Sequence, residues 1–276
     1  GYAFSMSKEK SDPAPSPFLR QFKKWGLRVG ALLAVLLIFQ VGLLAFPQAL
    51  LSKEAAAGSV VIHYGGPADP SIAQLALEVD HRLSSGGFGT SGHPKDIFFF
   101  PNQGLYSFFA QLARVTPQAQ GFGISFLGNA FVSGPRVKAL GERTGREPAF
   151  SVWEGSVSHT VAHEIAHLIL IDSIGRKAWL RLPHWKQEGF PEYMANIGLI
   201  RADPEDSLQD RIRVLLDDGV WSAPRSWDRI HFEAGLFVEY LLEVKGMGFQ
   251  RALTDGLTRE EVLSEMVAWA RQSTPE

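Results

Sequence analysis

Two histidines and a glutamate near the middle of the chain have the spacing of a metal site. The segment 158–171, SHTVAHEIAHLILI, contains His163, Glu164 and His167. Residues four apart lie on one face of an α-helix, so both imidazoles can bind the same Zn²⁺. Glu164 lies beside the first histidine, where it can take a proton from a metal-bound water. The apolar residues between them recur at helical spacing, which indicates a buried helix. The chemistry predicted is hydrolysis by an activated water molecule.

A catalytic zinc needs a third protein ligand and an open position. The segment 182–198, LPHWKQEGFPEYMANIG, supplies Glu188 and Glu192, again four apart and on one face of a second expected helix. His159 extends the histidine stripe by one turn. Three histidines over two turns span about 11 Å, too far for one tetrahedral ion. We interpret His159 as a residue at the rim or behind the ligands, and His184 as a loop residue near the cleft.

The two segments together resemble the gluzincin zinc peptidases, which include thermolysin, the aminopeptidase N-type enzymes and the peptidase MA-like domains. In that group a helix that begins around an E-G-x-x-x-Y phrase donates the third ligand through its first glutamate. The match here is Glu188, Gly189 and Tyr193, preceded by Trp185. The resemblance is specific over roughly residues 157–198.

The resemblance implies a role for each site residue. His163, His167 and Glu188 are the implied ligands of one Zn²⁺ per chain, and Glu164 is the implied general base. Glu192 falls where these families often place an acidic residue that binds the free nitrogen of a ligand histidine, which raises ligand basicity. A solvated surface glutamate is the alternative for Glu192.

Related enzymes stabilise the tetrahedral oxyanion with a Tyr or His on a later helix. The candidates are His231 and Tyr240, in the segment 227–246. Many peptidase MA-like domains hold a Tyr where this chain has Ile230-His231-Phe232, so the sequence departs from the pattern. We select His231, with Asp228 nearby, as the second catalytic residue; an ordinary histidine at a helix start is the alternative. Tyr240 lies in an apolar stripe and is expected in the core.

These residues predict a zinc metallopeptidase that hydrolyses peptide bonds in a peptide or protein substrate. The alternative is a catalytically silent zinc-binding scaffold or assembly protein of the same fold, although a purely structural site does not need Glu164. An intramembrane protease is excluded, because Asp172 and Lys177 interrupt the apolar run after the motif. A membrane-protein partner that gates the cleft is a further alternative.

An apolar segment precedes the expected catalytic domain. Residues 29–46 carry no charge, and four cations lie just before them: Arg20, Lys23, Lys24 and Arg28. The positive-inside rule then predicts a cytoplasmic tail over 1–26, a transmembrane anchor over 27–46 in the lipid bilayer, and a metallopeptidase domain over 58–276 outside the cell membrane. The alternative is a signal peptide cleaved near Ala55-Ala56-Ala57, which yields a secreted protein.

The elements that must position the site are strands followed by helices. Strands are expected at 59–64, 96–100 and within 121–133, with helices around 72–83 and 103–114. From Ser156 the pattern is helical, and Thr258 with Glu261 predicts a capping box for the last helix. The fold class expected is α+β: an N-terminal transmembrane helix, then a zincin-like domain with a small mixed sheet, the HExxH helix and a C-terminal helical lobe. In the resembled families the strand before the zinc helix is the edge that binds substrate.

Composition excludes several other classes. The 276 residues contain 27 Lys and Arg against 29 Asp and Glu, and the first 28 residues carry six of these cations against two acidic residues. The acidic remainder has no basic patch for nucleic acid. The chain has no cysteine, which excludes disulfides, thiolate metal sites and cysteine nucleophiles.

Overall fold

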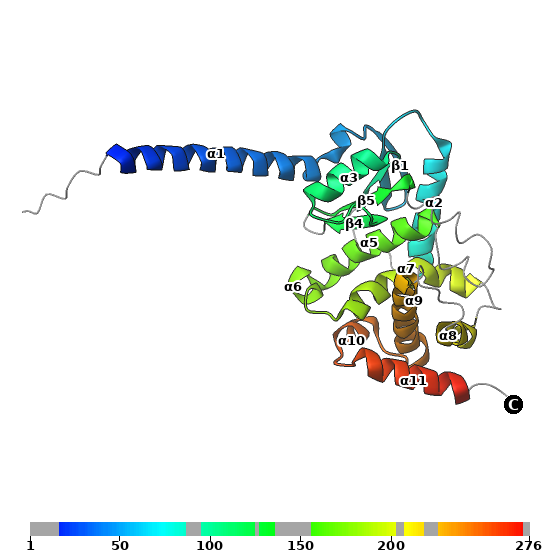
Figure 1. The fold of residues 1–276 in the computed structure, drawn as a ribbon. Helices are drawn as coiled ribbons and strands as arrows, with labels where there is room; N and C mark the ends of the chain where they lie inside the picture. Colours follow the sequence, from blue (N-terminus) through cyan, green and yellow to red (C-terminus); the bar gives the residue numbers. More distant parts are fainter. Residues whose placement is uncertain are drawn as a thin grey trace, which may run out of the picture. The chain divides into compact units, whose positions relative to one another are not determined.

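The computed structural model describes residues 17–86, 95–124, 127–135, 156–202, 207–217 and 226–272. The chain divides into two compact units, residues 1–44 and 45–276. Figure 1 shows the helices and strands of both units.

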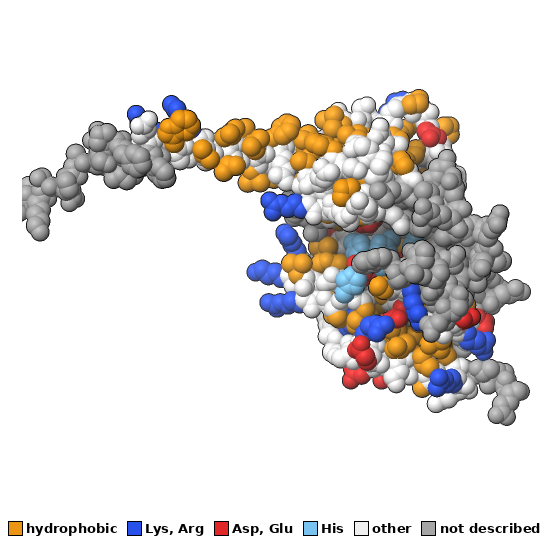
Figure 2. All heavy atoms as spheres, viewed as in Figure 1, with side chains coloured by type: hydrophobic (Ala, Val, Ile, Leu, Met, Phe, Trp, Pro, Cys, Tyr) orange, Lys and Arg blue, Asp and Glu red, His pale blue; other side chains and the backbone are white. Residues whose placement is uncertain are grey.

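Helix α1 spans Pro17–Ala45, and all of it except Ala45 belongs to the first unit. Its 22 residues Lys24–Ala45 are long and apolar enough to cross a membrane, and a signal sequence has the same properties. Figure 2 shows hydrophobic side chains along this helix. Residues 1–16 of the expected cytoplasmic tail lie outside the described residues, and from Pro17 the tail is already helical.

The second unit contains a five-stranded mixed sheet in the order β1-β2-β3-β5-β4. Parallel pairing joins β2, β3 and β5, whereas β1 and β4 pair antiparallel at the two edges. The sheet confirms the expected strands and adds β1, which the sequence pattern did not predict. The strands are β1 Lys53–Ala57, β2 Val60–Tyr64, β3 Lys95–Phe100, β4 Gly121–Ile124 and β5 Asn129–Ser133.

The presence of β1 moves the start of the folded unit. The unit begins at Ala45, and Lys53 of β1 pairs with Tyr64 of β2, ahead of the start at residue 58 that we expected. The alanines considered as a signal-cleavage site are paired residues of this strand. Alanine is uncommon in strands, so this segment carried no strand signal, and backbone pairing with β2 holds it in the sheet.

Helices cover both faces of the sheet and continue beyond it. The helices with described bounds in this unit are η1 Pro47–Ala49, α2 Pro70–Ser85, α3 Gln103–Leu112, α5 Val157–Ile174, α6 Arg176–Trp179, α7 His184–Ala202, α8 Leu208–Leu216, α9 Ser226–Glu239, the π-helix η3 Tyr240–Val244, α10 Phe249–Thr254 and α11 Arg259–Gln272. Because α2 and the segment with α3 connect parallel strands, helices already alternate with strands in the first half. The expected order of strands first and helices later therefore holds only after β5.

Side-chain alternation along the strands explains the two covered faces. Ile62 and Ile97 point to the face covered by α2 and α5, where they join the main core. Phe98, Phe100 and Phe131 point to the opposite face, where Phe100 and Phe131 pack against Phe109 of α3 and Phe98 packs against Phe131. The site depends on the first face, because α5 carries the predicted metal-binding motif across β4 and β5.

The C-terminal helices position the second half of the site. Helix α7 packs against α5, α9 and α2, so it lies between the motif helix and the C-terminal lobe. The last helix has the expected capping box, in which Glu261 N–H donates to Thr258 Oγ1 at 3.2 Å and Thr258 N–H donates to Glu261 Oε2 at 2.8 Å. Val262 and Met266 of this helix are buried, as their spacing predicts.

Candidate metal centre

Helix α5 presents the histidine–glutamate motif to a cleft. The helix is capped by Ser156, whose Oγ accepts a hydrogen bond from the backbone N–H of His159 at 3.0 Å. Most of its residues are buried against the sheet and α7. His163 is buried and His167 is half-buried, so neighbouring atoms restrict both rings.

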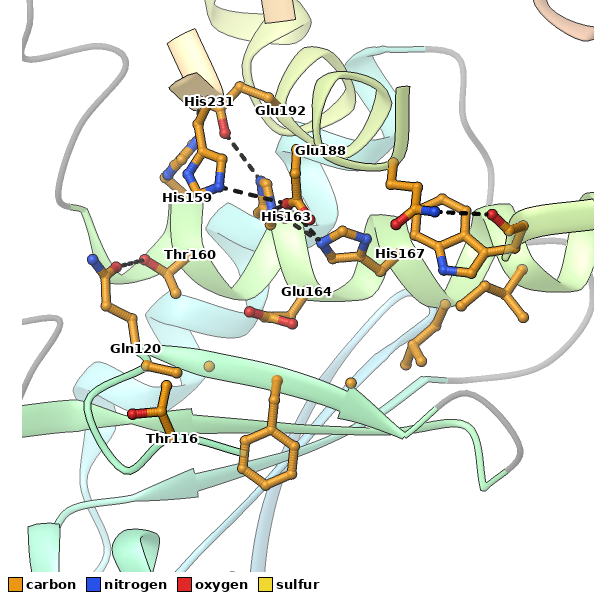
Figure 3. A pocket seen from close by; sticks show the side chains of 18 of the residues that line it. Thr116, Gln120, His159, Thr160, His163, Glu164, His167, Glu188, Glu192 and His231 are labelled. Carbon is orange, nitrogen blue, oxygen red and sulfur yellow. Dashed lines mark hydrogen bonds and ion pairs between the residues drawn. The ribbon is translucent and has the colours of Figure 1, made fainter. Parts of the chain in front are cut away.

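Three donor atoms converge where α5 faces α7 (Figure 3). His163 Nε2 and His167 Nε2 are 3.1 Å apart, and Glu188 Oε2 lies 3.4 Å from the first and 3.5 Å from the second. Zinc–nitrogen bonds of about 2.0–2.1 Å in a tetrahedron place neighbouring ligand atoms about 3.3–3.4 Å apart. The three observed separations match these edges, and the three residues could hold a metal ion.

A second group of donors lies directly behind the first and shares His163. Glu192 Oε2 is 3.0 Å from His163 Nδ1, and Glu192 Oε1 is 3.0 Å from His159 Nε2. These three residues could also hold a metal ion. The two histidines contact different oxygens at hydrogen-bonding distance, however, which is the geometry of a carboxylate that accepts two N–H groups. A proton on His163 Nδ1 leaves the lone pair of Nε2 directed at Glu188 and His167.

Electrostatic interactions keep Glu192 ionised. Burial by itself raises the pKa of this carboxyl, but the charge and hydrogen bonds of His159 and His163 lower the pKa well below its usual value. Asn196 Nδ2 adds a third donor, 3.0 Å from Glu192 Oε1. Glu192 is therefore a buried anion with its oxygens satisfied, and the alternative of a solvated surface glutamate is wrong.

Burial and hydrogen bonding also shift the pKa values of His163 and Glu188 in opposite directions. Burial lowers the pKa of His163, but hydrogen bonds to Glu188 and Glu192 outweigh it and raise the pKa to about 10. Burial raises the pKa of Glu188, yet hydrogen bonds to His163 and His167 give a net lowering. In the absence of a metal, a proton on His163 compensates the two carboxylates; a divalent cation compensates the same charges.

Glu164 lies on the side of α5 that faces β4 (Figure 3). A methyl group at Gly121 would lie 2.7 Å from Glu164 Oε1 and 2.8 Å from its Cγ, so the glutamate packs directly on the glycine backbone. Burial raises the pKa of Glu164, while the charges of His167 and His163 oppose that increase. A carboxylate with a raised pKa is a better proton acceptor near neutral pH.

The two histidines outside the motif differ in their relation to the site. His231 of α9 lines the cleft, with Nε2 3.6 Å from Glu188 Oε2. Burial lowers the pKa of His231, and the charge of His163 lowers it further. His184 begins α7, so it is helical rather than a loop residue, and its exposed ring lies 3.9 Å from Glu188 Oε1. The side chain of Asp228, expected beside His231, lies outside the described residues.

The cleft has a volume of about 830 Å³, and its walls come from β4, α5, α6, α7 and α9. Figure 2 shows histidine side chains gathered on the face drawn. The edge strand β4 contributes Gly121, Phe122 and Gly123 to the wall. The three donors face this open space, and a tetrahedral ion held by them would have its fourth position available to a water molecule or a substrate.

Several residues of the site carried no recognisable sequence signal. Trp179 of α6 packs edge-on against His167 at 5.4 Å between ring centroids, and Gln187 Nε2 donates to the carbonyls of Trp179 and Leu182. Gln187 thus links the segment that contains Trp179 to helix α7, which contains Glu188. Tyr240, the other oxyanion candidate, packs with Trp269 in the core, as its apolar stripe predicts.

Comparison with known proteins gives no family assignment: no protein-family model matches this chain, and no curated protein matches it.

Proposed function

We propose that this chain is a zinc metallopeptidase that hydrolyses peptide bonds in a peptide or protein substrate. The observation that carries the proposal is the set of separations of 3.1, 3.4 and 3.5 Å among the donor atoms of His163, His167 and Glu188. Nitrogen and carboxylate donors in a tetrahedral set are typical of catalytic zinc. The open cleft and the adjacent Glu164 favour catalysis over a scaffold, since a structural site has four protein ligands and no need of a base.

The residues around the donors have separate tasks in this proposal. When bound, zinc polarises the scissile carbonyl and lowers the pKa of a bound water toward about 7. Glu164 accepts a proton from the attacking water and delivers it to the leaving amine. His231 of α9, which lines the cleft, donates a hydrogen bond to the oxyanion. Glu192 holds His163 in the tautomer that directs Nε2 outward.

We propose that α1 is an uncleaved anchor, with the catalytic unit on the outer face of the cell membrane. The cations Arg20, Lys23, Lys24 and Arg28 precede the apolar residues, which favours a cytoplasmic N-terminus. Cleavage after Ala57 would remove β1 from the edge of the sheet, and this favours retention of the anchor.

The test uses the full chain in detergent micelles, with zinc content and peptide-library cleavage measured on the same preparation. The variant is Glu164→Gln, and its matched control is Glu54→Gln, which removes the same charge from an exposed position on β1. We expect one zinc per chain in all three proteins and a 10²- to 10⁴-fold loss of cleavage in Glu164→Gln alone. Zinc without cleavage in the wild type would favour the scaffold, and absence of zinc would refute the metal site.

A further inference from the structure

Arg82, near the end of α2, makes hydrogen bonds to both helices that carry the converging donors. Its Nε donates to Ser158 Oγ at 3.1 Å and its Nη2 donates to Ser156 Oγ at 3.2 Å, both at the start of α5. Its Nη1 donates to the backbone carbonyl of Ala195 in α7 at 3.1 Å. The guanidinium is buried, so these bonds are protected from competing water.

The acceptors lie close to the donor residues along each helix. Ser156 caps α5 and Ser158 lies five residues before His163, while Ala195 lies three residues after Glu192. A planar guanidinium directs its N–H groups in fixed directions, so it constrains the separation of the groups that it joins. A change in the separation of α5 and α7 would move Glu188 relative to His163 and His167.

The positive charge of Arg82 is complemented by a negative charge of the site. Glu192 is a buried anion behind His163, and its charge interacts favourably with the Arg82 guanidinium. His159 contacts Glu192 from the first turn of α5, which the Arg82–Ser156 bond holds in place. Arg82 therefore supports the Glu192 contacts both through geometry and through charge.

We propose that Arg82 is a positioning residue that sets the distance between α5 and α7, and thereby the distance of Glu188 from His163 and His167. This inference rests on the metal site of the proposed function, but it does not depend on peptidase activity. It assigns a role to a side chain that touches none of the three donors.

The experiment measures the zinc dissociation constant of the full chain by competition with a chelator. Two variants separate the contributions: Arg82→Lys keeps the charge and loses the planar fork, whereas Arg82→Met loses both. The matched controls are Arg211→Lys and Arg211→Met, because Arg211 is also buried but pairs with Glu239 of α9. Thermal unfolding of the zinc-free proteins reports the general loss of stability in each pair.

We expect both Arg82 variants to bind zinc 10- to 100-fold more weakly, the range for residues that support metal ligands. The Arg211 variants should bind zinc as the wild type does, even when they lose as much stability. In the cobalt-substituted protein, Arg82→Lys should also change the visible absorption spectrum, which reports ligand geometry; Arg211→Lys should not.

An unchanged zinc dissociation constant and cobalt spectrum in folded Arg82→Lys would overturn the inference, and so would an equal loss of affinity in the Arg211 variants. If Arg82→Met does not fold, Arg82→Lys and Ser158→Ala still decide the question; Ser158→Ala removes the Nε acceptor and the hydrogen bond between Ser158 Oγ and Ser156 Oγ. A wild-type chain that binds zinc without cleaving peptides leaves this test valid. A wild-type chain that binds no zinc refutes the metal site itself and this inference with it.

Discussion

Gly121→Ala should separate catalysis from metal binding. The new methyl group would lie 2.7 Å from Glu164 Oε1, 2.8 Å from its Cγ and 3.0 Å from its Cδ. Ordinary van der Waals contact requires 3.4 Å or more, so the carboxylate must move by about 0.7 Å. A misplacement of about 1 Å costs about 10²-fold in rate, and we therefore expect kcat to fall by about 10- to 10²-fold.

Stability and zinc binding should change little in the same variant. The atoms that must move belong to one side chain rather than to backbone, and Gly121 is not among the described glycines with positive φ. Loss of chain entropy in the unfolded state favours Ala over Gly by about 0.4–1 kcal/mol, which offsets part of any strain. The three atoms nearest to the new methyl group all belong to Glu164 and none to the three donor residues, so one zinc per chain should remain.

Steady-state kinetics, zinc analysis and urea unfolding on the same preparations test this reasoning. Gly123→Ala is the matched control, because its methyl group would face the same helix two residues along β4 but would meet Leu168 at 3.3 Å instead of Glu164. We expect near-normal kcat in Gly123→Ala. Wild-type kcat in Gly121→Ala would refute the assignment of Glu164, held against β4, as the base.

Three other predictions address packing, metal linkage and pH. Gly189→Ala should destabilise the protein by about 1–3 kcal/mol in urea unfolding, because its methyl group would overlap the backbone carbonyl of Ala234 and separate α7 from α9; unchanged stability would show that this contact is not close in solution. Zinc at about 100 times its dissociation constant should add about 2.7 kcal/mol to the free energy of unfolding, reversibly with a chelator, and Glu188→Gln should abolish most of the gain; an equal gain in that variant would remove Glu188 from the ligands. Burial raises the pKa of Glu243, but hydrogen bonds from Tyr193 and Arg201 give a net lowering below 4.5, so its stabilising effect is present above that pH and is lost as the pH falls. The difference in unfolding free energy between the zinc-free wild type and Glu243→Gln should therefore stay constant from about pH 7 to about pH 5.5 and shrink as the pH falls to about 3. A difference that stays constant down to about pH 3 would contradict the pairing.

The metal-binding motif could be predicted from sequence because its geometry is local. His163 and His167 belong to one helix, and helical periodicity alone places residues four apart on the same face. The same reasoning predicted the buried stripe of α2 and the capping box at Thr258 and Glu261, since each depends on neighbours within one or two turns.

The contacts between segments that are distant in the sequence could not be predicted from local spacing. Glu188 and Glu192 are equivalent by spacing, and only the packing of α7 on α5 turns one toward the histidine Nε2 atoms and the other toward His163 Nδ1. The place of β1 depends on the backbone of β2, because its alanines carry no strand signal of their own.

The types and the spacing of the chemical groups on α5 follow from the amino-acid sequence alone, because a helix repeats every 3.6 residues wherever it forms. The distance from His163 to Glu188, the contact of Glu164 with Gly121 and the three hydrogen bonds of Arg82 depend instead on how the elements pack. Those contacts join residues 25 to 113 positions apart in the chain, and their geometry follows from how whole helices and strands pack rather than from any local pattern.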